Sequence, residues 1–128
     1  AAIAAINAGA RLGVLGEPIP LAASEDWDAR LAEFTVAILD ERGEILARGA
    51  GRDLMGHPLD VVLWLSAALA KSGIALAPGQ LLSLGTVTKL LPTRPGMVVR
   101  ARYDGLDPRG PVEIAVRFAP ATYERGRP

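Results

Sequence analysis

The sequence of 128 residues predicts an α+β fold that is mostly β: a twisted mixed sheet or partial barrel packed by one long helix. Two patterns lead to this prediction. Apolar and polar residues alternate over several short stretches, as they do in half-solvated strands. Residues 58–70 instead place apolar side chains on one helical stripe that opens with a proline. The length fits a single domain, which we assign to residues 1–118, followed by a tail at 119–128.

The first predicted elements are short. Residues 1–8 are expected to end a helix that stops at Gly9, and residues 11–15 to form a strand that ends at Gly16. The two prolines of "EPIPLAAS" disfavour both helix and central strand, so we expect an extended connection there. Ser24 is predicted to cap a short turn in "EDWDARL".

Residues 32–47 predict a β-hairpin. Phe34, Val36 and Ile38 would share one face of the first strand, because side chains in a strand alternate with a period of two. The sequence "DERGE" supplies a turn around Gly43, and the second strand returns after it.

The long helix is predicted to begin at Pro58, where the missing N–H costs nothing, and to end at Gly73 after Lys71. We expect it to pack on the sheet through one stripe of residues. The stripe consists of Leu59, Val62, Leu63, Ser66, Leu69 and Ala70.

Three further strands are predicted over residues 80–87, 97–103 and 112–118.

The composition narrows the classes of partner. The 14 basic residues balance 14 acidic ones, so a nucleic-acid partner is not expected. With no cysteine, disulfides, thiolate metal sites and a cysteine nucleophile are excluded, and this suits a cytoplasmic protein. The longest uncharged apolar run, residues 61–70, is about half of the ~20 residues that cross a bilayer, so no membrane segment is predicted. Because "AAIAAINAGARLG" lacks a basic start, no signal peptide is expected either.

The stretch "LSLGTVTKLLPTRPG", residues 82–96, carries the main candidate site. Thr86 and Thr88 are two residues apart, so their hydroxyls would point to the same side of an extended chain. Gly85 beside them would let a ligand approach the backbone. Together these groups suit a carboxylate or keto oxygen. The residues alone equally favour a threonine-rich strand end before a proline turn.

Two other groups of polar residues have simpler interpretations. His57 is the only histidine and precedes the helix-starting Pro58, which favours a structural role at the helix entry. Asp26 and Asp28, with Glu25 nearby, offer the oxygen ligands that hard cations prefer. We favour the alternative, that they are the acidic residues expected near a helix N-terminus. No residue is assigned a catalytic or metal-binding role from these patterns.

The ordered set of motifs resembles a known family. "MGHPLDVVLWLSAALAKSGIALAPGQLLSLGTVTKLLPTRPGMVVRARYDGL", followed by "VEIAVRF", is similar to the C-terminal part of the 2-keto-4-pentenoate hydratase and 4-oxalocrotonate decarboxylase family, which has a fumarylacetoacetate hydrolase-like fold. Upstream the similarity is looser: Asn7 fits, but Ile6 stands where the family usually has an acid. The matched features are the Gly-His-Pro entry at 56–58 with Trp64, Pro-Gly at 78–79, Gly-Thr-x-Thr at 85–88, Pro-Gly at 95–96 and "VRF" at 116–118.

The resemblance implies a metal-dependent lyase that binds Mg²⁺ or Mn²⁺ through carboxylates and acts on 2-keto or 2-hydroxydienoate acids from aromatic-ring breakdown. The metal would chelate the 2-oxo acid and stabilise an enolate while water adds or CO₂ leaves. The metal-binding acids of the family, an acid-x-acid pair and a further glutamate, lie upstream of the segment with which this chain begins. We therefore expect a domain without its N-terminal part, and a chain that is inactive alone.

The resemblance also implies a substrate-binding set. Thr86 takes the position of the family's usual serine and Thr88 that of its threonine, and Gly85 and Asn7 belong to the same set. Lys89 replaces a small residue and is expected to face solvent, although it could also add charge for a diacid. Family members commonly assemble, so a homo-oligomer is expected.

Hydration of 2-hydroxypenta-2,4-dienoate is the leading interpretation. A 4-oxalocrotonate-type decarboxylase is the alternative within the same family. A non-catalytic relative that only binds a ligand or partner is a further one, in which Ile6 and Lys89 would mark lost chemistry. An acylpyruvate-type hydrolase shares the fold but would require a different loop at residues 85–89.

Overall fold

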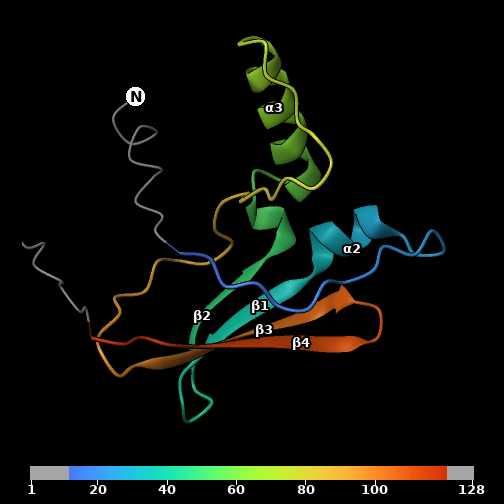
Figure 1. Cartoon of the computed structure of the whole chain (residues 1–128). Coiled ribbons are helices and arrows are strands. Elements are labelled where there is room, and N and C mark those ends of the chain that lie inside the picture. Colours follow the sequence, from blue (N-terminus) through green and yellow to red (C-terminus); the bar gives the residue numbers. More distant parts are fainter. Residues whose placement is uncertain (1–11, 121–128) are drawn as a thin grey trace, which may run out of the picture.

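The computed structural model describes residues 12–120, and its centre is a four-stranded sheet in the order β2-β1-β3-β4 (Figure 1). All three strand pairs are antiparallel, so the α+β class is confirmed but the predicted mixed sheet is wrong. Direct hairpins join β1 to β2 and β3 to β4, and a hairpin makes its strands antiparallel. The strands are β1 (Thr35–Leu39), β2 (Ile45–Ala50), β3 (Val98–Asp107) and β4 (Gly110–Arg117).

The β1–β2 hairpin confirms the predicted pattern at residues 32–47. Its turn is built around Asp40, whose Oδ1 accepts hydrogen bonds from the backbone N–H groups of Arg42 and Glu44, both at 2.8 Å. Gly43 has a φ of +85°, in the left-handed region that glycine adopts without strain. The two predicted C-terminal strands are also confirmed as β3 and β4.

The sheet has one apolar and one polar face. Residues directly opposite in the ladder share a face, and Val36 pairs with Tyr103, which in turn pairs with Val112. Val36 is 2% exposed and marks the core. The opposite face carries ion pairs between Arg100 and Glu113 (3.2 Å) and between Arg102 and Asp104 (3.0 Å).

Irregular segments lie against the apolar face near both edge strands. Near β4, a Cβ added to Gly16 would lie 3.1 Å from the side chain of Ile114. Near β2, a Cβ added to Gly49 would lie 1.7 Å from the carbonyl oxygen of Val87. The chain around residue 16 therefore lies near one edge strand of the sheet, β4, and the chain around residue 87 lies near the other, β2.

The strands predicted at residues 11–15 and 80–87 are wrong, since residues 12–20 and 81–94 contain no strand. Leu82, Leu84 and Val87 are half-buried, so their alternation reflects contact with the body of the protein and not pairing at a sheet edge. Gly85, with a φ of +114°, breaks the extended backbone that a ladder would need.

Helix α2 (Trp27–Glu33) begins at Asp26, whose side chain accepts a hydrogen bond from Ala29 N at 3.0 Å. The predicted capping role of Ser24 is therefore wrong, because a better placed acceptor follows it. A 3₁₀ turn, η2 (Gly51–Asp53), packs on the C-terminal end of α2. A Cβ on Gly51 would lie 1.8 Å from Leu31 O, so this contact requires glycine.

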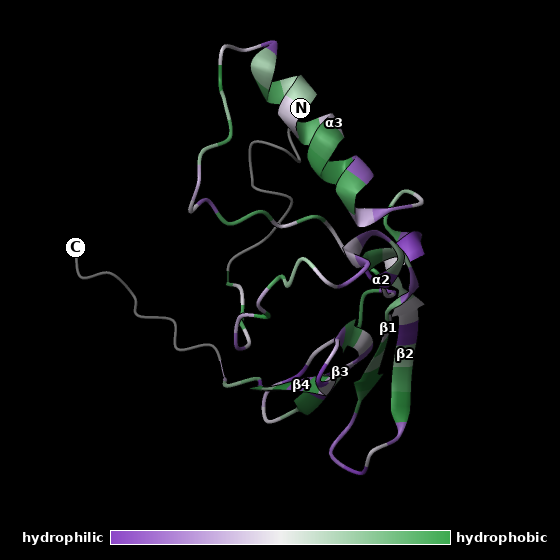
Figure 2. Ribbon diagram, turned by 90° about the vertical axis from the view of Figure 1, so that its right-hand side faces the viewer, coloured by the Kyte–Doolittle hydropathy of each residue, from purple (hydrophilic) through white to green (hydrophobic). Residues whose placement is uncertain are grey.

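Helix α3 (Pro58–Ala70) has the predicted bounds, with Pro58 in its first turn and Gly73 at a φ of +71° beyond its end. The expectation that α3 packs on the sheet is wrong. The helix leaves β2 through η2, contacts α2, and projects away from the strands (Figure 1). Its ribbon is coloured hydrophobic along most of its length (Figure 2). The side chains of Leu63 and Trp64 are nevertheless 67% and 62% exposed.

Several predictions fall on residues 1–11 and 121–128, outside the described part of the chain: the helix at 1–8, Gly9, Ile6, Asn7 and most of the tail. Within residues 12–120, no helix is both long and apolar enough to cross a membrane.

Candidate functional site

The predicted threonine segment, residues 85–88, lies between α3 and β3 in sequence and against the end of β2 in space. Two contacts hold it there. The carbonyl group of Val87 lies directly over Gly49 in β2. The Leu54 side chain lies beside Gly85, with Cδ2 only 3.3 Å from the position that a Cβ would take.

Thr86 and Thr88 form one hydrogen-bonded turn. The Thr86 hydroxyl donates to Thr88 O at 2.9 Å, and Thr88 N donates to Thr86 Oγ1 at 3.4 Å. This is the local turn that threonine commonly builds with its own backbone. The proton of Thr86 is thus used inside the turn, whereas the Thr88 hydroxyl forms no hydrogen bond within residues 12–120.

The turn presents two threonine side chains beside an exposed glycine. Thr86 is exposed and Thr88 is half-buried, so a ligand can reach both from solvent. A threonine hydroxyl can donate one hydrogen bond and accept others. Lys89, next in sequence, is exposed, and Asn7 lies outside the described residues. Gly85, Thr86 and Thr88 are near neighbours in the sequence, and the structure adds the hydrogen-bonded turn between the two threonines.

Two residues that lie beside the turn, Gly49 and Asp53, were not predicted from the sequence to be near it. Gly49 gives the space that Val87 occupies, and its only sequence signal is a glycine inside a predicted strand. Asp53 lies near the same point: its Oδ2 is 3.4 Å from the Gly49 Cβ position and accepts a hydrogen bond from Ala50 N at 2.7 Å. That carboxylate therefore fixes the start of η2.

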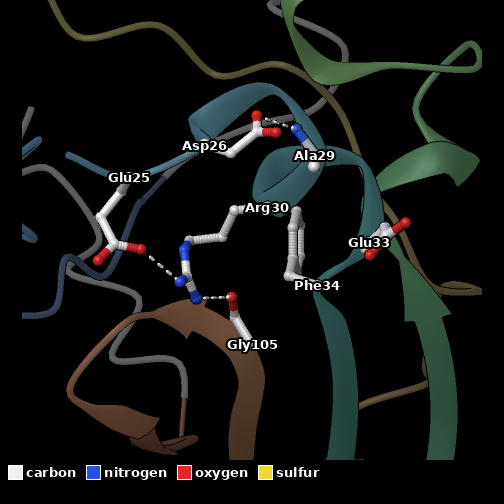
Figure 3. Close-up of a pocket in the computed structure, with 7 residues that line it drawn as sticks. All are labelled: Glu25, Asp26, Ala29, Arg30, Glu33, Phe34 and Gly105. Carbon is white, nitrogen blue, oxygen red and sulfur yellow. Dashed lines mark hydrogen bonds and ion pairs between the residues drawn. The ribbon is translucent and has the colours of Figure 1, made fainter. Parts of the chain in front are cut away.

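A separate cavity of about 430 Å³ lies between α2 and β3 (Figure 3). At its wall Arg30 donates to Glu25 Oε2 at 2.6 Å and to Gly105 O at 2.8 Å, while its buried Nε finds no partner among the described residues. The Arg30 charge is matched by Glu25, and its other bond ties α2 to β3. We interpret this arginine as a link between elements.

The acidic residues near α2 have separate roles. Glu25 pairs with Arg30, Asp26 caps the helix, and Asp28 turns toward His57. Within residues 12–120, no group of three or more His, Cys, Asp or Glu side chains is arranged to hold a metal ion. The described residues therefore do not fit a divalent metal, and the cap interpretation of Asp26 is supported.

His57 is built into the start of α3. Its Nδ1 accepts a hydrogen bond from Leu59 N at 3.1 Å, so we place the ring proton on Nε2. Nε2 lies 2.9 Å from Asp28 O and 3.6 Å from Asp28 Oδ1. The histidine thus caps one helix and contacts another, which supports the structural role inferred for it.

The chain is similar in sequence to several curated enzymes, although no protein-family profile matches it. It is 33% identical over 69 residues to 4-oxalocrotonate decarboxylase of Pseudomonas sp. strain CF600, covering 54% of this chain and 26% of that enzyme. It is 31% identical over 101 residues to 2-keto-4-pentenoate hydratase of Burkholderia vietnamiensis, covering 78% of this chain and 36% of that enzyme. The chain thus spans about a third or less of the length of these relatives.

Solved structures give a matching result. 4-Oxalocrotonate decarboxylase from Pseudomonas putida G7, complexed with calcium and acetate, superposes with a TM-score of 0.61 and 31% identity over 70% of this chain and 32% of that one. The same enzyme complexed with magnesium and adipate superposes equally well. At this identity the match supports common ancestry as well as a similar fold.

Proposed function

We propose that the chain is part of a metal-dependent lyase of the 2-keto-4-pentenoate hydratase and 4-oxalocrotonate decarboxylase family, to which it is similar over part of its length. The reaction that we propose is hydration of 2-hydroxypenta-2,4-dienoate-type acids in the breakdown of aromatic compounds. The match to the hydratase of B. vietnamiensis carries this proposal. An aligned stretch that covers 78% of the chain necessarily includes its middle, and so the threonine turn.

The role proposed for the threonine turn is to bind the carboxylate or oxo group of the substrate. Thr88 is the stronger donor candidate, because the Thr86 hydroxyl already donates its hydrogen bond to Thr88 O. Gly85 would let the ligand reach the backbone beside them, and Asn7 is retained in the set from the family resemblance. The acetate and adipate in the complexes of the decarboxylase are carboxylates, which is the chemistry that this proposal requires.

A divalent metal is proposed for the whole enzyme. The similar decarboxylase has been solved in complexes with calcium and with magnesium. For the whole protein to which this chain belongs, we propose Mg²⁺ or Mn²⁺. Since the described residues hold no suitable cluster, we derive no catalytic step through the metal from them. The ligands proposed are an acid-x-acid pair and a glutamate outside this chain, and the chain alone is proposed to be inactive.

The organisation of the protein is proposed to follow the family. Residues 1–118 would form a fumarylacetoacetase-like domain that lacks its N-terminal part, with residues 119–128 as a tail. The whole protein would be cytoplasmic, consistent with the absence of cysteine. It would self-associate, and the apolar side chains of α3 that remain exposed support this.

Decarboxylation is the second candidate reaction, because the 4-oxalocrotonate decarboxylases match this chain at 33% identity. The two reactions leave different products: a hydratase adds water to the conjugated chain, whereas a decarboxylase releases CO₂. Measuring CO₂ release from 4-oxalocrotonate beside loss of the dienoate distinguishes them.

The sequence encoded immediately before Ala1 gives a first test. We expect an acid-x-acid pair and a further glutamate in it, because a lyase of this type needs carboxylates to hold its metal. If the open reading frame holds no such acids, the lyase proposal fails. A non-catalytic relative that only binds a ligand or partner would then be the better interpretation.

A further inference from the structure

Gly49 occupies the point at which the threonine segment touches the sheet. A Cβ at this position would lie 1.7 Å from Val87 O and 2.6 Å from Val87 C, far closer than any side chain allows. Gly49 is not among the glycines with positive φ, so an L-residue would suit its backbone. Glycine is therefore required here for space alone, and the space is filled by the residue between Thr86 and Thr88.

Val87 joins the two threonines of the turn. Its carbonyl lies in the middle of the turn closed by the Thr86–Thr88 hydrogen bonds. Displacing that carbonyl from the sheet would move or open the turn. We propose that Gly49 is a positioning residue for the ligand turn, holding Thr86 and Thr88 in binding geometry by admitting the Val87 carbonyl. This inference rests on the proposed function, because it takes the turn to be a substrate site.

Leu54 supports the same turn from another side. Its Cδ2 lies beside Gly85, and it is joined to β2 through η2, since Leu54 N donates to Gly51 O at 3.0 Å. Removing this side chain would loosen the turn without placing any new atom in β2. Leu54 therefore provides a second, milder way to test the proposal.

The test compares three variants of the protein expressed from its complete open reading frame. Gly49→Ala places a methyl group against Val87, and Leu54→Ala removes the contact with Gly85. Gly13→Ala is the matched control, because its methyl group would meet no atom within 4 Å and the position has no positive φ. Steady-state kinetics with 2-hydroxypenta-2,4-dienoate and amide NMR spectra are recorded for each.

We expect Gly49→Ala to lower kcat/KM by roughly 10- to 100-fold, because displacements of about 1 Å at a binding site have effects of this size. The loss should appear mainly as a higher KM, in Leu54→Ala as well, and the amide signals of residues 86–88 should shift. Gly13→Ala should keep the wild-type kcat and KM.

An unchanged KM in both Gly49→Ala and Leu54→Ala would overturn the proposal, as would an equal rise of KM in Gly13→Ala. If Gly49→Ala does not fold, Leu54→Ala decides the result. If the unmodified protein turns over no dienoate, the proposed function fails separately. The amide signals then test the placement of the turn by itself: unshifted signals of residues 86–88 in Gly49→Ala show that Gly49 does not position it, and overturn the proposal.

Discussion

The Thr86 hydroxyl does two things in the folded chain: it closes a turn through Thr88 O, and it faces solvent. Replacing it with valine removes the turn bond at a cost of about 0.5–1.5 kcal/mol, which should leave the protein folded. We predict that Thr86→Val lowers turnover by distorting the turn. Circular dichroism and steady-state kinetics check this, and unchanged kinetics would return Thr86 to a purely structural role.

Thr88 should respond more strongly in substrate binding. Its hydroxyl is free of hydrogen bonds within residues 12–120, and a bond to a charged carboxylate is worth about 1.5–3 kcal/mol. Thr88→Val should therefore raise KM by roughly 10- to 100-fold, while Thr88→Ser, which keeps the hydroxyl, should stay near the wild-type KM. Equal KM values for Val and Ser would show that this hydroxyl does not contact substrate.

The Asp107 carboxyl should make the stability of the fold depend on pH in the acid range. Hydrogen bonds from the Arg109 side chain and backbone lower the pKa of this carboxyl from 3.8 to about 2. Because the folded state favours the ionised form, its stabilisation is present above the ordinary pKa of 3.8 and is lost as pH falls through about 2. Urea unfolding between these values should show a weaker pH dependence for Asp107→Asn. Identical pH profiles for both proteins would contradict this.

At the level of single elements, the start of α3 depends on the His57 side chain. His57→Ala removes the Nδ1 acceptor of the Leu59 N–H and should cost about 0.5–2 kcal/mol of unfolding free energy. His57→Asn should recover the cap, since asparagine is among the best N-cap residues, but not the contact with Asp28. Urea denaturation of the three proteins measures both contributions; equal stability of His57→Ala and wild type would refute the capping role.

The exposed apolar side chains of α3 should contribute to self-association of the whole protein. Leu63 and Trp64 contact little within residues 12–120, so replacing either with glutamate should change the stability of the isolated chain by less than about 0.5 kcal/mol. The same changes should reduce self-association of the whole protein, whereas Ser66→Glu, at an exposed polar position of the helix, should not. Light scattering after size-exclusion chromatography decides this; unaltered masses for Leu63→Glu and Trp64→Glu would place the subunit interface elsewhere.

Elements defined by local patterns could be predicted, and those defined by distant contacts could not. The β1–β2 hairpin and the bounds of α3 follow from a turn around Gly43 and from Pro58 and Gly73. The alternation of Leu82, Ser83 and Leu84 suits a strand equally well as a segment lying on another surface. Only the tertiary structure, with Val87 over Gly49, distinguishes the two.

At the scale of the molecule, the described residues form a sheet with irregular chain against its apolar face and two ion pairs on its polar face. The candidate site could be located from Gly85, Thr86 and Thr88 together with the family resemblance. Its supports, Gly49 and Leu54, could not, because they lie more than thirty positions away in the sequence and meet the turn only through folding.

The most direct test of the lyase proposal is the absorbance of 2-hydroxypenta-2,4-dienoate, followed with the protein expressed from its complete open reading frame. We predict that absorbance falls when Mg²⁺ is present, stops falling when the metal is chelated, and does not fall with residues 1–128 alone. A complete, folded protein that leaves the absorbance unchanged with Mg²⁺ or Mn²⁺ would contradict the assignment as a hydratase.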